Sequence, residues 1–128
     1  MSDCDGSLHP AAVEGIRLFN RGEYFEAHEA LETAWRDEPG PIRELYRGIL
    51  QIAVAYLHIT RDNYAGAIKV YGRSQRWLRL WPASCRGVDV AGLQRDAEQA
   101  LAEVQRLGPQ NLASFDRRLF KPIHYDHL

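Results

Sequence analysis

Hydrophobic residues recur every three or four positions along most of this chain, and clusters of Gly, Pro and Asn interrupt the pattern. This spacing is typical of amphipathic α-helices, because side chains three and four residues apart share one helix face. The pattern predicts five helices, over residues 10–20, 23–37, 41–60, 63–81 and 89–107. No segment of useful length alternates apolar and polar positions with a period of two, so we expect no β-sheet and an all-α fold class.

A weak internal repeat indicates how these helices are arranged. Residues 20–27 resemble residues 61–67, and each segment is a turn followed by an aromatic and a small residue at the start of a helix. Two such units predict stacked helical hairpins in the manner of tetratricopeptide-like repeats, with helix 89–107 as a cap. We therefore predict a compact bundle of about five helices in a single domain over residues 1–128. The tail, 108–128, has a short helical turn around residues 115–120 and is expected to be mobile.

The composition is that of an ordinary globular domain, with 45% hydrophobic residues and 16 Lys and Arg against 17 Asp and Glu in 128 residues. This near-neutral charge disfavours a dedicated nucleic-acid binder. The longest apolar stretch, residues 49–59, contains Gln51 and His58 and is too short to span a membrane. The first ten residues lack the basic and apolar regions of a secretory signal. We predict a cytoplasmic protein that does not enter the membrane.

Two cysteines, Cys4 and Cys85, stand far apart in the sequence. They form neither a disulfide framework nor a zinc-binding spacing, so reduced thiols are the simpler expectation.

One edge of helix 23–37 carries polar residues inside its apolar sector. His28 and Glu32 are one turn apart, between Trp35 and Phe25 on the helical wheel. At this spacing the carboxylate can fix the tautomer of the imidazole or stabilise its charged form. The two groups can also bind a metal, although two ligands alone are too few.

Helix 41–60 carries a complementary polar stripe that includes Gln51 and His58. A short linker makes it the antiparallel neighbour of helix 23–37, so we expect the two polar stripes to meet. The resulting candidate cluster, with its apolar walls, consists of His28, Glu32, Gln51, His58, Tyr24, Trp35 and Tyr56.

Three interpretations of this cluster stay open. It could be a structural network that fixes the register of two helices, a ligand pocket with acid–base capability, or a metal site. The candidate catalytic residues and the candidate metal ligands are the same three, His28, Glu32 and His58, with Gln51 orienting substrate or water. A divalent metal is the one cofactor that this residue set suggests, and the sequence assigns none.

Two helices also carry charged faces of opposite sign. Helix 63–81 is basic at Lys69, Arg73 and Arg76, and the outer side of helix 23–37 is acidic at Glu26 and Glu29. Such faces are usually solvated, but they also fit a protein partner or self-association.

The residues in 21–32, followed by Trp35, resemble the opening signature of a family catalogued as domain of unknown function 309 (DUF309). The pattern continues through residues 45–58 and then Asn63-x-x-Gly66-Ala67. One departure is Asp62, where the family usually has Gly. The resemblance implies a compact all-helical fold, with a family-like core over about 8–107, and leaves the activity open. The signature positions that it implies in the candidate region are His28, Glu29, Glu32, Gln51 and His58, which adds Glu29 to the candidate binding residues.

Two functions from different classes follow from these observations. The first is a small helical interaction or scaffold module in which the cluster is structural. The alternative is a metal-binding protein or acid–base enzyme that uses His28, Glu32 and His58. The sequence therefore leaves open whether the protein is an enzyme.

Overall fold

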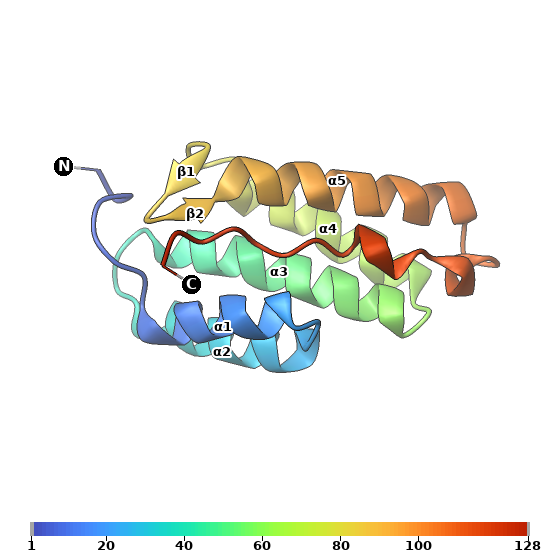
Figure 1. Cartoon of the computed structure of the whole chain (residues 1–128), viewed down its shortest axis with the longest axis horizontal. Helices are drawn as coiled ribbons and strands as arrows, with labels where there is room; N and C mark the ends of the chain where they lie inside the picture. Colours follow the sequence, from blue (N-terminus) through green and yellow to red (C-terminus); the bar gives the residue numbers. More distant parts are fainter. Residues whose placement is uncertain (1, 128) are drawn as a thin grey trace.

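The computed structural model describes residues 2–127 and has five α-helices in this range, as predicted (Figure 1). They are α1 (Pro10–Asn20), α2 (Tyr24–Asp37), α3 (Arg43–Thr60), α4 (Tyr64–Leu78) and α5 (Val90–Leu107). Two short 3-10 turns, Leu112–Ser114 and Arg117–Leu119, follow α5. The all-α class is therefore confirmed. Among residues 2–127 we find no helix with both the length and the apolar character required to cross a bilayer.

A small hairpin between α4 and α5 was not expected. Strands β1 (Ser84–Cys85) and β2 (Val88–Asp89) pair in antiparallel fashion. The two residues between them, Arg86 and Gly87, both have positive φ, 50° and 85°, which is the backbone that a two-residue hairpin turn requires. The expectation of no sheet is wrong here because strands of two residues are too short to show a period of two.

Consecutive helices pack as neighbours, and α3 lies at the centre. Figure 1 shows α1 and α2 side by side, α3 and α4 above them, and α5 at the top, as expected for stacked hairpins. Close helix approach depends on small residues: a methyl group at Gly48 of α3 would lie 2.6 Å from a side-chain carbon of Leu78 in α4. The largest fully buried side chains of α3 are Leu45, Tyr46, Ile49, Ile52 and Tyr56.

The two segments of the internal repeat form the same type of turn in the structure. Gly22 after α1 and Asp62 after α3 both adopt left-handed backbone, with φ of 79° and 57°. In each case the N–H of the following residue donates to the carbonyl five residues back, at 3.0 and 2.9 Å. This hydrogen bond is the mark of a Schellman helix end. Asp62 thus takes the place of the usual Gly and preserves the turn.

The tail after α5 is held against the bundle, so the expectation of a mobile tail is wrong. Leu112, Phe115, Ile123 and Tyr125 are buried. The Asn20 side chain donates to the carbonyl of Ile123 at 3.0 Å and accepts from its N–H at 2.7 Å. In Figure 1 the tail crosses the bundle between α5 and α1. Its apolar residues fill separate gaps, and for this reason they show no helical or strand period.

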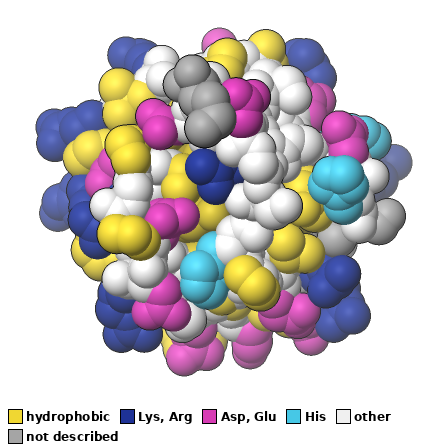
Figure 2. All heavy atoms as spheres, turned by 90° about the vertical axis from the view of Figure 1, so that its left-hand side faces the viewer, with side chains coloured by type: hydrophobic (Ala, Val, Ile, Leu, Met, Phe, Trp, Pro, Cys, Tyr) yellow, Lys and Arg dark blue, Asp and Glu magenta, His cyan; other side chains and the backbone are white. Residues whose placement is uncertain are grey.

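Cys4 and Cys85 form a disulfide, so the expectation of reduced thiols is wrong. The segment before α1 folds back onto the hairpin, where the N–H of Arg86 donates to the carbonyl of Cys4 at 3.1 Å. The Arg86 guanidinium also donates to the carbonyls of Asp3 and Ser7. This contact is tertiary, between segments 81 residues apart, and the spacing of the cysteines could not reveal it. Figure 2 views this end of the molecule and shows acidic and basic side chains intermixed over it.

Candidate functional site

The His28 and Glu32 side chains lie on an open side of α2. The Nε2 atom of His28 is 3.2 Å from a carboxylate oxygen of Glu32, and the two side chains are 29% and 41% exposed. The sequence places both in an apolar sector, but α2 packs between α1 and α3 and leaves this edge in contact with solvent. The pair borders an open cavity of about 280 Å³, whose other walls are Phe25, Glu29, Thr33 and Arg36.

A second open cavity, of about 270 Å³, adjoins the first because Glu32 lines both. Its remaining walls come from α2 and α3 and are Trp35, Arg47, Leu50 and Gln51. The predicted meeting of the two helices therefore brings Glu32, Trp35 and Gln51 together around one depression.

Trp35 is the centre of a stack of cationic and aromatic side chains. The guanidinium carbons of Arg43 and Arg47 lie 4.3 and 4.9 Å from its ring centre, and Arg47 also lies 4.2 Å from the ring centre of Trp77. Such cation–π contacts fix the orientation of a partly buried tryptophan. The indole of Trp35 is thus a firm wall of this cavity.

Two polar atoms beside this cavity are buried and unpaired. The indole nitrogen of Trp35 and the amide oxygen of Gln51 have no hydrogen-bond partner within residues 2–127. An unpaired buried polar group costs about 1–3 kcal/mol.

His58 belongs to a different part of the fold. Its Nδ1 atom is 3.1 Å from the side-chain nitrogen of Asn63, whose oxygen caps α4 by accepting from the N–H of Gly66 at 2.9 Å. Seven residues, or about 10 Å of helix rise, separate Gln51 from His58 along α3. Nowhere between residues 2 and 127 are three or more His, Cys, Asp or Glu side chains grouped so that they could hold a metal ion. The structure therefore does not assemble His28, Glu32 and His58 into one ligand set.

The surroundings of His58 predict a pH dependence of stability. Partial burial, reinforced by the nearby Arg61 charge, lowers the pKa of His58 below its usual value. The unfolded chain therefore takes up this proton at a higher pH than the folded chain does. The contribution of neutral His58 to the free energy of unfolding is therefore fully present above a pH of about 6.5. It is lost as the pH falls toward the lower pKa that His58 has in the folded chain.

We expect His58→Gln to flatten the fall in unfolding free energy between about pH 7 and pH 5, because glutamine does not titrate there. Glutamine keeps an acceptor for the Asn63 side chain, so the cap of α4 should survive. His124→Gln, at an exposed position of the tail, is the matched control and should retain the wild-type slope. Urea denaturation at a series of pH values measures the effect, and equal slopes in all three proteins would contradict the assignment.

Tyr24 and Tyr56 lie in an aromatic cluster and not at the walls of these two cavities. The cluster comprises Phe19, Tyr24, Tyr56 and Phe120, which come from α1, α2, α3 and the tail. The ring centres of Tyr24 and Tyr56 are 5.4 Å apart, and those of Tyr56 and Phe120 are 4.7 Å apart. Burial raises the pKa of Tyr24 to about 12 and also raises the pKa of Tyr56, so both hydroxyls keep their protons.

Sequence reasoning missed a third cavity, of about 380 Å³, between this cluster and the tail. It depends on Arg117, Phe120 and Lys121, which lie in the segment that was expected to be mobile. The mixture of basic and aromatic residues in that segment was the one feature of the sequence that could have indicated this cavity.

These features define a compact helical domain with an open polar face on α2 and α3. The family described as Domain of unknown function (DUF309) matches residues 12–70, which run from α1 into α4. This match confirms the resemblance that the signature residues indicated.

Two curated proteins are similar to the chain. It is 40% identical over 72 residues to the uncharacterized protein YpuF of Bacillus subtilis (strain 168), a match that covers 56% of this chain and 40% of that protein. It is 24% identical over 102 residues to an uncharacterized protein of Aquifex aeolicus (strain VF5), covering 77% of this chain and 30% of that protein. The chain thus spans less than half the length of these relatives, whose names state no activity.

Proposed function

We propose that this chain is a protein-interaction module whose α2–α3 face binds a second copy of the chain. The α2–α3 face consists of Phe25, His28, Glu29, Glu32, Trp35, Arg36, Arg47, Leu50 and Gln51. One observation carries the proposal: two cavities adjoin each other on one face of the domain. This face combines an exposed aromatic side chain with charges of both signs. Tryptophan and arginine, both present here, are enriched at protein interfaces and among the residues that dominate their binding energy.

The face has apolar side chains that an interface would cover. The Phe25 side chain is 43% exposed, an unusual position for a large aromatic residue. Leu50 and Trp35 form an apolar floor a few residues away.

The order of charges along α2 favours a second copy as the occupant. A two-fold axis that passes through this face perpendicular to α2 would place the two α2 helices antiparallel and bring the same surface of both copies together. Glu29 of one copy would then face Arg36 of the other, and the same contact would occur twice. The formal net charge of −1 leaves little long-range repulsion between copies.

A charge reversal tests this arrangement. We expect Glu29→Arg or Arg36→Glu alone to raise the dimer dissociation constant by about tenfold, because each change converts two attractive contacts into two repulsive ones. The double variant Glu29→Arg/Arg36→Glu restores opposite charges and should recover the wild-type constant. Sedimentation equilibrium over a range of protein concentrations measures all four proteins.

The control for this experiment lies on α1. Glu14 and Arg17 are exposed and 3.7 Å apart, and their single reversals should leave the dimer unchanged. A wild-type protein that stays monomeric at high concentration would refute the proposal. So would a double variant that associates no better than the single variants.

A further inference from the structure

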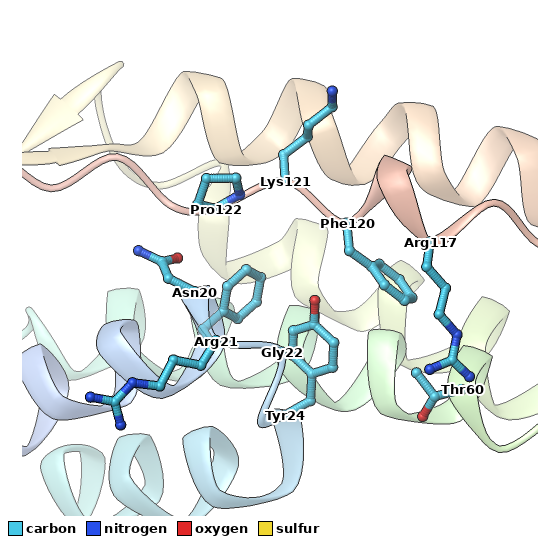
Figure 3. A pocket seen from close by; sticks show the side chains of 10 residues that line it. Asn20, Arg21, Gly22, Tyr24, Thr60, Arg117, Phe120, Lys121 and Pro122 are labelled. Atoms are coloured by element: carbon cyan, nitrogen blue, oxygen red, sulfur yellow. The ribbon is translucent and has the colours of Figure 1, made fainter.

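We propose that the cavity under the tail, named here the tail cavity, binds the phosphate group of a small organic phosphate. It lies where the α1–α2 turn, the end of α3 and the tail meet, and its volume is about 380 Å³ (Figure 3). The lining residues used in the argument are Arg21, Tyr24, Thr60, Arg117, Phe120 and Lys121. This volume is in the range of small-molecule sites.

Three cationic side chains contribute to the lining of the tail cavity. Arg21, Arg117 and Lys121 line it, and none of its lining residues is an Asp or Glu. Within the part of the chain that the structure describes, neither Arg117 nor Lys121 forms an ion pair, and Arg21 has only an exposed contact with Glu23 at 3.9 Å. Several cations around one concave surface attract an anion and bind it more strongly than a single exposed cation does.

Neutral hydrogen-bonding groups complete the lining. In Figure 3 the hydroxyl of Tyr24 points toward the tail, and the guanidinium of Arg117 extends toward Thr60. Burial raises the pKa of Tyr24 to about 12, although the Arg117 charge acts in the opposite direction. The phenol is therefore protonated at physiological pH and can donate a hydrogen bond to a phosphate oxygen.

The tail backbone that carries the cationic residues is held in position before any ligand arrives. Phe120 packs with its ring centre 5.3 Å from that of Tyr24, and the backbone of Ile123 is bound on both sides by the Asn20 side chain. The tail therefore keeps Phe120 against Tyr24, with Arg117 extending toward Thr60 at the end of α3 (Figure 3). Such preorganisation reduces the entropy lost on binding.

A phosphate monoester fits this lining better than a simple carboxylate. Its doubly charged, tetrahedral group offers acceptor oxygens to guanidinium, ammonium and hydroxyl donors that approach from different directions. The faces of Phe19 and Phe120 supply apolar walls for the organic part. Inorganic phosphate shares the charged group but not the apolar part, so the two can be distinguished experimentally.

Calorimetric titration with inorganic phosphate, phenyl phosphate and benzoate at constant ionic strength tests the site. We expect saturable binding of phenyl phosphate at one site per chain, with weaker binding of inorganic phosphate and weaker still of benzoate. Arg117→Gln and Lys121→Gln should each weaken phenyl phosphate binding by about tenfold, since each removes one charge-assisted contact. Tyr24→Phe should weaken it by a smaller factor.

Arg118→Gln is the matched control. Arg118 lies in the same 3-10 turn as Arg117, but it is paired with Asp116 at 2.9 Å and does not line the cavity. Its replacement should leave binding unchanged. The proposal is overturned if no ligand binds saturably, or if Arg118→Gln weakens binding as much as Arg117→Gln does. The ligand site and the α2–α3 face share no residue, so each experiment decides its own proposal.

Discussion

Replacing Tyr56 by alanine should lower the free energy of unfolding by about 3–5 kcal/mol, the range for large buried aromatic side chains. The ring of Tyr56 is completely buried in α3. It packs against Phe19, Tyr24 and Phe120, with ring centres 4.7 to 5.5 Å away. These contacts join α1, α2 and the tail to the central helix, so the cavity left by alanine would weaken four parts of the fold.

Tyr56→Phe, in contrast to Tyr56→Ala, is not expected to lower the free energy of unfolding. The hydroxyl of Tyr56 is buried without a hydrogen-bond partner within residues 2–127. Tyr56→Phe keeps the ring and removes a polar group whose unpaired burial costs about 1–3 kcal/mol, so stability should hold or rise. Urea denaturation followed by far-ultraviolet circular dichroism measures both variants. A Phe variant that loses as much stability as the Ala variant would contradict this description of the aromatic cluster.

The second large effect concerns the disulfide. Cys4→Ser/Cys85→Ser should lower the free energy of unfolding by about 2–5 kcal/mol. The bond closes a loop across a sequence separation of 81 residues, and its removal gives the unfolded chain much more conformational freedom. It also ties the segment before α1 to the hairpin that precedes α5, where Arg86 forms its hydrogen bonds.

Reduction supplies the matched comparison for the disulfide variant. Dithiothreitol should bring the wild-type protein to the stability of the double serine variant and should have no effect on that variant. Because serine and reduced cysteine are similar in size, the comparison isolates the covalent link from packing. Two titratable thiols in the folded protein, purified without reductant, would show that the bond is not formed.

The helices could be predicted because their signals are local. Asn63 and Asp89 stand at the start of two of the predicted helices, and their side chains cap α4 and α5 by accepting from the N–H groups of Gly66 and Gly92. The turn after α1 recurs after α3 with the same hydrogen bond, although Asp62 replaces Gly there. Each of these features involves residues within about one helical turn of one another, so the chain itself carries the information.

The candidate site could be predicted only in part. Periodicity places His28 and Glu32 one turn apart on α2, and the contact between their side chains follows from that spacing alone. The grouping with His58 required the register between two helices, and the structure places His58 against Asn63 instead. A wheel diagram shows the direction of a side chain around its own helix but not which level of the neighbouring helix lies opposite.

By itself, the sequence determined the number of helices, their approximate ends, the all-α class and the family signature. Only the tertiary structure decided the Cys4–Cys85 disulfide, the docking of the tail and the cavity lined by Arg117 and Lys121. The reason is the range of the interactions. Helices follow from hydrogen bonds and apolar spacing over three or four residues, whereas these other features join segments distant in the sequence through contacts that leave no periodic pattern.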